Sequence, residues 1–189
     1  MHYYIQEHGK MRRNIRKISI RAHAVRLGGV FLLLCLALTS CANPFRFINY
    51  SLSNTPRYSM TANPPYKNIY KKTIKVVSYN IKHSARIREA IHLLKNNPNL
   101  ADADILLLQE MIPSAVEKIA ADLGYNYIFY PAVIHPLLHD NFGNAVLSKW
   151  PITYDENIIF PSIKENSRHR VAVAAKLKIN EKDVMVYSL

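Results

Sequence analysis

Polar side chains follow two apolar runs of the sequence at the points where each run ends. Asn80 follows the β-rich run 74–79, and Gln109 and Glu110 follow the apolar run 105–108. A carboxylate at the end of a buried strand costs free energy unless it is paired or binds a cation. Because Mg²⁺ prefers carboxylate and amide oxygens, the pattern indicates a metal site. The alternative is that Glu110 caps the next helix or pairs with a lysine, and that Asn80 makes a turn.

Several other kinds of site are excluded by the positions of glycine and cysteine. The five glycines leave no phosphate loop of the GxxxxGK[ST] type, no GxGxxG fingerprint and no GxSxG elbow. The two cysteines cannot form a four-cysteine zinc site. His135 and His139 have the spacing of a helical metal pair, but Pro136 argues against a continuous helix. His169 is the remaining candidate, and we predict no histidine metal site.

The net charge of +12 suggests a nucleic-acid or anionic-membrane partner until its location is considered. Residues 1–40 hold seven Lys and Arg against one Glu, which is half of the net charge. An apolar run follows at 30–38, too short for a membrane span of about 20 residues. This arrangement is typical of a signal peptide, which we assign to residues 1–40. The remaining charge is a mild bias that does not argue for nucleic acid.

The end of this segment, Leu38-Thr39-Ser40-Cys41, resembles the bacterial lipobox. The resemblance implies cleavage before Cys41, attachment of lipid to its sulfur, and export to the cell envelope as a membrane-anchored lipoprotein. Met11 would give a more ordinary start than Met1. Residues 41–72 carry four prolines and no persistent period, which predicts a mostly extended tether between lipid and domain.

From residue 73 the sequence predicts a compact domain, 73–189. The expected helices are 84–95, with Ser84 as N-cap, and a second that begins at Pro113 and ends at Gly124. Strands are expected at 74–79, 105–108, 125–129, 144–148, 157–160, 171–178 and 184–188, with a hairpin turn at 180–183. Helices come early and the rest is mostly strand, which favours a layered α/β sandwich over a doubly wound sheet.

Four segments of residues 73–189 together resemble the endonuclease/exonuclease/phosphatase superfamily. These metal-dependent phosphodiesterases include DNase I-like nucleases, sphingomyelinases and inositol-phosphate phosphatases. The segments are Val76–Ile81 (VVSYNI), Ala103–Glu110 (ADILLLQE), Phe142–Ile152 (FGNAVLSKWPI) and Arg168–Ala174 (RHRVAVA). The resemblance implies an α+β fold, a four-layer α/β sandwich of the DNase I-like type, with the site at one end between the sheets.

The same resemblance implies the roles of individual residues. Glu110 would be the principal ligand of Mg²⁺, or Mn²⁺, and Asn80 would hold metal-bound water or a phosphate oxygen. Arg170, with Arg168 as the second choice, matches an arginine that contacts substrate phosphate, and Asn144 would line the same cleft. The alternative is that the arginines are exposed strand-edge residues and that Asn144 serves a turn. The reaction would be hydrolysis of a phosphodiester or phosphomonoester by in-line attack of water, which a His–Asp pair activates.

In the family, a strand that resembles 184–189 is followed by a catalytic histidine, and later by Gly-Asp-x-Asn and Ser-Asp-His segments. This sequence ends at Leu189. We therefore expect about the first half of the domain, with the inner face of its first sheet left open and no activity of this chain alone. The competing function is a non-catalytic, membrane-anchored binding module. Nucleic acid, phospholipid and inositol phosphate all remain open as substrates.

Overall fold

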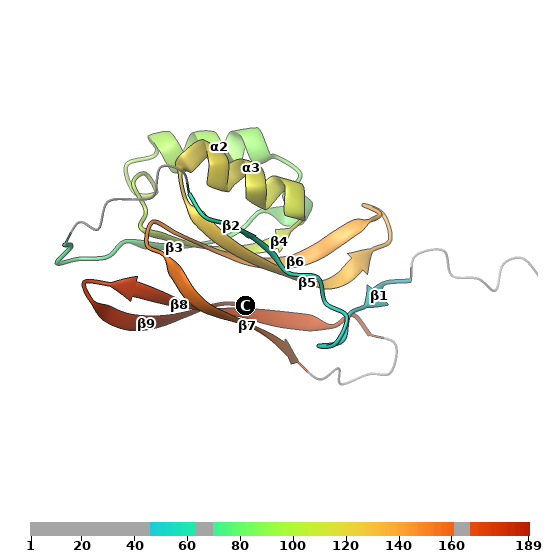
Figure 1. Cartoon of the computed structure of the whole chain (residues 1–189). Helices are drawn as coiled ribbons and strands as arrows, with labels where there is room; N and C mark the ends of the chain where they lie inside the picture. Colours follow the sequence, from blue (N-terminus) through green and yellow to red (C-terminus); the bar gives the residue numbers. More distant parts are fainter. Residues whose placement is uncertain (1–45, 63–69, 161–166) are drawn as a thin grey trace, which may run out of the picture. The chain divides into compact units, whose positions relative to one another are not determined.

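The computed structural model describes residues 46–62, 70–160 and 167–189, which lie in one compact unit, Phe45–Leu189. The predicted signal peptide, 1–40, and the predicted lipidation site, Cys41, lie outside the described residues. The unit is layered, with two helices over a large sheet and a small sheet beneath it (Figure 1). No helix in these three described ranges is long and apolar enough to cross a membrane.

The large sheet has six strands in the order β1-β5-β6-β4-β3, and β2 also pairs with β5. Their bounds are β1 Ile48–Asn49, β2 Tyr58–Met60, β3 Val76–Asn80, β4 Ile105–Met111, β5 Asn126–His135 and β6 Asp140–Ser148. β3 and β4 are parallel, and the other pairs are antiparallel. The parallel register places Asn80 opposite Gln109, so both polar ends of the apolar runs meet at one edge of the sheet.

The first strands lie where the sequence predicts a tether. Ile48 pairs with Ile134 and Tyr58 pairs with Phe129, so β1 and β2 together cover the outer edge of β5. Strands of two and three residues are too short to give a recognisable period of two in the sequence. The packed unit therefore begins well before residue 73 and includes residues 48–60.

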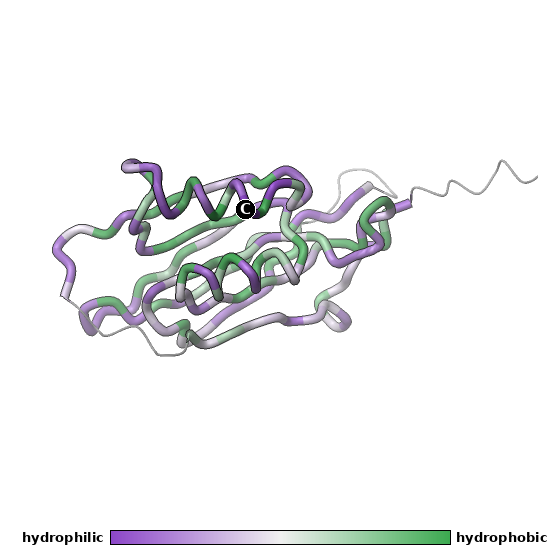
Figure 2. Tube along the Cα trace, turned by 90° about the horizontal axis from the view of Figure 1, so that it is seen from above, coloured by the Kyte–Doolittle hydropathy of each residue, from purple (hydrophilic) through white to green (hydrophobic). Residues whose placement is uncertain are grey.

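Two helices, α2 (Ile87–Asn96) and α3 (Pro113–Leu123), cover one face of the large sheet. Hydrophobic and hydrophilic residues alternate along both (Figure 2), and each helix buries one hydrophobic stripe against the sheet, whereas Leu93 of α2 is exposed. Their buried side chains are Ala90, Ile91, Leu94, Ala115, Val116, Ile119 and Ala120. As predicted, α3 starts at Pro113 and ends at Gly124, whose φ of 73° lies in the left-handed region that glycine adopts without strain.

The small sheet packs on the opposite face of the large sheet. Its antiparallel strands are β7 (Ile152–Phe160), β8 (Arg170–Ile179) and β9 (Lys182–Ser188). The core between the sheets includes Ile105, Ile128, Val146, Trp150, Val173 and Leu177. The inner face of the large sheet is thus covered, in contrast to the expectation that it would be open. Of the four expected layers, the described residues form three, without a helical layer on the outer face of the small sheet.

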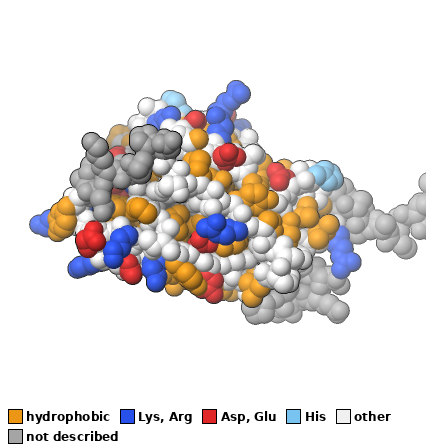
Figure 3. Space-filling model, viewed as in Figure 1, with side chains coloured by type: hydrophobic (Ala, Val, Ile, Leu, Met, Phe, Trp, Pro, Cys, Tyr) orange, Lys and Arg blue, Asp and Glu red, His pale blue; other side chains and the backbone are white. Residues whose placement is uncertain are grey.

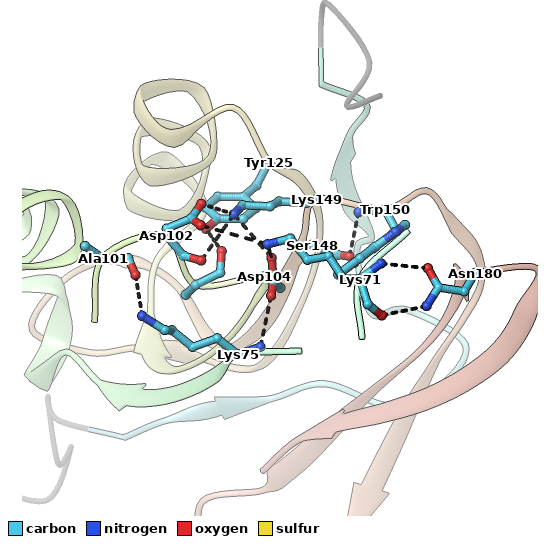
Figure 4. A network of polar contacts seen from close by, with 11 residues as sticks. Lys71, Lys75, Ala101, Asp102, Asp104, Tyr125, Ser148, Lys149, Trp150 and Asn180 are labelled. Carbon is cyan, nitrogen blue, oxygen red and sulfur yellow. Dashed lines mark hydrogen bonds and ion pairs between the residues drawn. The ribbon is translucent and has the colours of Figure 1, made fainter. Parts of the chain in front are cut away.

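A network of polar contacts lies at the amino-terminal ends of β3 and β4 (Figure 4). Asp104 is 2% exposed, accepts a hydrogen bond from the Lys75 backbone N–H at 2.9 Å, and is ion-paired with Lys71 and Lys149. The Asn180 side chain exchanges hydrogen bonds with the Lys71 backbone at 3.2 and 2.8 Å. The network therefore joins the β8–β9 turn to the large sheet, at the opposite end of β4 from Glu110.

The face drawn in Figure 3 carries scattered Lys and Arg side chains interspersed with Asp and Glu. Cations do not gather there into one continuous patch. Uninterrupted positive charge is what a nucleic-acid backbone requires for strong binding. This face therefore agrees with the mild charge bias expected of the residues after the first forty.

Candidate functional site

A pocket of about 410 Å³ opens at the carboxyl-terminal ends of β3 and β4. It brings together all four sequence-predicted site residues of the domain: Asn80, Glu110, Asn144 and Arg170. The rest of its lining is Gln109, Ala132, Phe142, Gly143, Phe160, Arg168, His169, Val171 and Leu189. Among titratable side chains, one carboxylate faces two arginines and a histidine, so the lining favours an anionic ligand.

Irregular pairing on both sides of Gly143 shapes the floor of the pocket. On β4 the register shifts between Leu108 and Met111, and on β5 it shifts between Pro131 and Val133. Such bulges bend a strand and redirect its side chains. Only glycine fits at position 143, because a Cβ there would lie 2.1 Å from the Tyr130 carbonyl oxygen. The local backbone therefore turns Glu110 out of the regular alternation of β4.

Glu110 is held in an unusual conformation by the turn that follows β3. Its φ is 59°, a left-handed value that costs a non-glycine residue about 1–2 kcal/mol. Its Oε2 accepts a hydrogen bond from the His83 backbone N–H at 3.3 Å and lies 3.6 Å from His83 Nε2. His83 belongs to the 3₁₀ turn η1 (Lys82–Ser84) and also has a positive φ, 54°. The carboxylate is thus positioned by backbone strain and by a short turn of matching shape.

Ser84 is not the N-cap of a helix, contrary to the sequence prediction. The helix begins later, at Ile87, and its N-cap residue Arg86 makes no side-chain capping bond. The Ser84 hydroxyl instead accepts a hydrogen bond from the Ile112 N–H at 3.1 Å and lies 3.5 Å from the Glu110 carbonyl oxygen. Ser84 therefore ties η1 to the end of β4, because this non-local contact replaces the local cap.

Gln109 lines the pocket as a residue that sequence reasoning noted but did not assign a role. Its Nε2 donates to Leu107 O at 3.1 Å and to Ser188 Oγ at 3.2 Å. Ser188 is fully buried, and its hydroxyl donates to Leu108 O at 3.1 Å. Gln109 thus links β4 of the large sheet to β9 of the small sheet beside the pocket.

Asn144 and the two candidate arginines lie on the β6 and β8 side of the pocket. Asn144 Nδ2 donates to Val171 O at 2.8 Å, which joins the two sheets across the cleft. Arg170 is the exposed first residue of β8. Arg168 precedes that strand and has its guanidinium carbon 5.5 Å from the Phe47 ring centroid and 5.9 Å from that of Phe142. A guanidinium suits phosphate because its planar fork can bind two oxygens.

A cluster of aromatic rings supports the pocket from behind. The buried His135 ring lies 4.9 Å from His83, 5.2 Å from Phe47 and 5.0 Å from Phe142, measured between centroids. Burial lowers the pKa of His135, as do the nearby His83 and Arg168. Its Nδ1 accepts hydrogen bonds from the backbone N–H groups of Leu137 and Leu138, at 3.2 and 3.3 Å. His135 is therefore neutral near pH 7 and serves as a packing surface for His83.

The donors at this pocket fit a divalent cation of the magnesium type. No group of three or more His, Cys, Asp or Glu side chains in the described ranges is arranged to hold a metal. Mg²⁺ does not need such a cage, because it binds through one or two carboxylates and keeps several waters. Glu110 supplies a carboxylate, and Asn80 and Gln109 supply amide oxygens on the same pocket wall. Glu110 and Asn80 are the residues that would hold the ion.

The candidate site residues of the pocket all lie within the region of the chain that matches a known protein family. A sequence model of the endonuclease/exonuclease/phosphatase family matches residues 77–181, which include Asn80, Glu110, Asn144 and both arginines. No curated protein matches the chain.

Three solved structures from different sources are among those similar to this chain. A humanized TDP2 of D. rerio carrying 14 mutations has 18% identity and a TM-score of 0.46, over 60% of this chain and 45% of that one. An endonuclease/exonuclease/phosphatase family protein from Leptotrichia buccalis C-1013-b has 17% identity and a TM-score of 0.48, over 62% and 54%. Sphingomyelinase C from Streptomyces griseocarneus has 20% identity and a TM-score of 0.44, over 62% and 48%. The matched region thus spans about half the length of these chains.

Proposed function

Because the chain belongs to the endonuclease/exonuclease/phosphatase family, we propose that its pocket binds a divalent metal and a phosphate ester as part of a phosphoesterase site. The observation that carries the proposal is the meeting of one carboxylate, three amide side chains and two arginines at one end of the large sheet. Residues of these types come from β3, β4, β6 and the start of β8, which are far apart in sequence. Strand pairing brings β3, β4 and β6 together, and the packing of the small sheet on the large one adds β8.

On the metal side, Glu110 and Asn80 would hold Mg²⁺ or Mn²⁺ through their oxygens. When bound, such an ion neutralises the charge that develops on phosphate oxygens during hydrolysis. The left-handed backbone at Glu110 and its hydrogen bond from His83 fix the carboxylate before the ligand arrives. A fixed carboxylate requires little reorganisation in the reaction, which is the condition for effective electrostatic stabilisation.

On the phosphate side, Arg170 would contact the ester and Asn144 would hold the pocket wall. The Arg170 guanidinium is permanently charged and can donate two parallel hydrogen bonds to phosphate oxygens. The Asn144 side chain fixes the Val171 carbonyl next to Arg170, and so orients the start of β8. Nucleic acid, phospholipid and inositol phosphate all carry the phosphate ester that this arrangement would recognise.

Metal titration of the whole chain tests this proposal directly. We expect Mn²⁺, followed by calorimetry, to bind the wild-type chain at one site, and Glu110→Gln to weaken it by at least about tenfold, because an amide replaces the single charged ligand. Glu89→Gln, on the exposed face of α2, is the matched control and should leave the affinity unchanged. Equal affinities for wild type and Glu110→Gln would refute the proposed metal site.

We also propose that the mature protein is lipid-anchored at Cys41 in the cell envelope after removal of residues 1–40. The support is the basic segment, the short apolar run and the Leu38–Cys41 pattern. In cells that process lipoproteins, Cys41→Ser should move the chain from the membrane fraction to the soluble fraction, whereas Cys35→Ser should not. Retention of the Cys41→Ser chain in the membrane after carbonate washing would contradict the anchor.

A further inference from the structure

The segment Phe47–Tyr50 is hydrogen-bonded to the residues on both sides of Arg168. Asn49 Nδ2 donates to Ser167 O at 3.0 Å, and Asn49 Oδ1 accepts from the His169 N–H at 2.9 Å. The His169 ring completes the contact, because its Nδ1–H donates to the Tyr50 carbonyl at 3.0 Å. One side chain of β1 therefore satisfies polar groups of the residues immediately before and after Arg168, and so fixes the direction in which that side chain leaves the backbone.

Aromatic rings hold the Arg168 side chain itself. Its guanidinium carbon lies 5.5 Å from the ring centroid of Phe47 and 5.9 Å from that of Phe142. Both distances are within the range of cation–π attraction. Phe142 belongs to the lining of the pocket, as does Arg168, whereas Phe47 packs behind them on a buried cluster. The guanidinium is thus held in the pocket wall by apolar surfaces that leave its N–H donors for another partner.

The charge of Arg168 is not neutralised within the parts of the chain that the structure describes. The ion pairs between described residues join other cations to carboxylates, and none of these pairs includes Arg168. A fixed arginine that stacks on aromatic rings beside a pocket is arranged to bind an anion. Ordering a free arginine costs up to about 2 kcal/mol of rotamer entropy on the scale for long side chains, so stacking in advance favours ligand binding.

We infer that Arg168 binds phosphate in this pocket together with Arg170, and that Phe47 and Asn49 are its positioning residues. The inference rests on the proposed function and adds a second cation to its phosphate side. It also extends the site to β1, which lies outside the family match at 77–181 and within residues 41–72, whose prolines predict a tether.

Titration of inorganic phosphate into the whole chain, followed by NMR or calorimetry, tests the inference without relying on turnover. Arg168→Gln should weaken phosphate binding by about tenfold or more, the effect of losing one charged hydrogen bond. Arg168→Lys keeps the charge but loses the planar fork, and should recover only part of that loss. Thermal unfolding of each variant, measured alongside, reports whether the fold is retained.

Variants of β1 separate positioning from simple packing. Phe47→Leu keeps an apolar side chain but removes the π face, and should weaken phosphate binding by about threefold, whereas Phe47→Tyr should bind as the wild type does. Asn49→Ala should weaken it by about three- to tenfold. Ile48→Ala is the matched control on the same strand, because the Ile48 side chain is 61% exposed, and should have no effect.

The outcomes separate this inference from the proposed function. If the wild type binds phosphate and Arg168→Gln binds it equally well, the inference is overturned and the proposed function stands. If Phe47→Leu and Asn49→Ala change only the unfolding temperature, their role is packing and the positioning part is overturned. A wild-type chain that binds no phosphate would overturn both proposals.

Discussion

The Glu110 carboxylate accepts a hydrogen bond from the His83 backbone N–H at 3.3 Å, and both residues have left-handed backbones, with φ of 59° and 54°. Residues outside the favoured regions persist only where their surroundings enforce them, and they gather at functional sites. The end of β4 thus stores strain at the residue that we propose as the metal ligand.

This strain predicts that glycine is tolerated at position 110. In Glu110→Gly, relief of about 1 kcal/mol of left-handed strain offsets the loss of about 1 kcal/mol from the hydrogen bond. We expect the free energy of unfolding in urea to change by less than about 1 kcal/mol, while metal binding is lost. Glu117→Gly, at an exposed position of α3, is the comparison and should lose about 1 kcal/mol. A much larger loss at position 110 than at 117 would show that Glu110 is not strained.

A second prediction concerns the close approach of β5 and β6 at Gly143. An added Cβ would lie 2.1 Å from the Tyr130 carbonyl oxygen and 2.6 Å from the Pro131 Cα, so backbone atoms would have to move. Gly143→Ala should therefore lower the free energy of unfolding by about 3 kcal/mol or more. Gly124→Ala meets no atom within 4 Å and should cost only about 1 kcal/mol, from its φ of 73°. Similar losses in the two variants would contradict the close approach.

The sequence predicted those elements whose signals are local. Pro113 and Gly124 mark the two ends of α3, and the 180–183 segment makes its turn with Asn180 and Glu181 at φ of 48° and 62°. The polar residues Gln109 and Glu110, which follow the apolar run 105–108 in the sequence, line the pocket, and their role as site residues stays a prediction.

Features that depend on distant contacts were not predictable in this way. β1 and β2 exist because β5 offers them a free edge, and their own residues carry no strand pattern. Ser84 contacts the end of β4 rather than the first turn of α2. The bulge that turns Glu110 follows from pairing with Gly143, and neither residue type signals it alone. Asn49 reaches the site only through tertiary packing.

A third prediction concerns turnover. The described lining of the pocket holds one carboxylate side chain, that of Glu110, which we propose as the metal ligand. Any Mg²⁺-dependent hydrolysis of DNA, RNA, sphingomyelin or phosphoinositide should therefore be lost in Glu110→Gln and retained in Glu89→Gln. Turnover that survives in Glu110→Gln would contradict the proposed role of Glu110, and the preferred substrate would identify the class.

The last prediction concerns acid stability and the buried carboxylate of Asp104. Burial raises the pKa of this group. Hydrogen bonds from Lys71, the Lys75 backbone and Lys149 lower it by a larger amount, so that the pKa of Asp104 lies below its ordinary value. A carboxylate whose pKa is lowered by folding contributes its full stabilisation at pH values above its pKa in the unfolded chain, about 3.9. This stabilisation is lost as the pH falls from there through the pKa of the folded state. Asp104→Asn should therefore lower the free energy of unfolding by about 1–3 kcal/mol at pH 7, because Lys71 and Lys149 lose one of the two carboxylates that they share and keep the other, Asp102.

The pH dependence distinguishes this ionic contribution from a packing defect. The difference in the free energy of unfolding in urea between wild type and Asp104→Asn should narrow below about pH 4. There the Asp104 carboxylate of the wild type takes up a proton and loses its charge, as the asparagine variant already has. Asp183→Asn is the control, since Asp183 is 56% exposed and its pair with Lys178 at 3.5 Å should contribute less than about 1 kcal/mol. A difference for Asp104→Asn that stays constant from pH 7 to pH 3 would mean that the amide disturbs packing, and that the charge of Asp104 does not hold this end of the sandwich together.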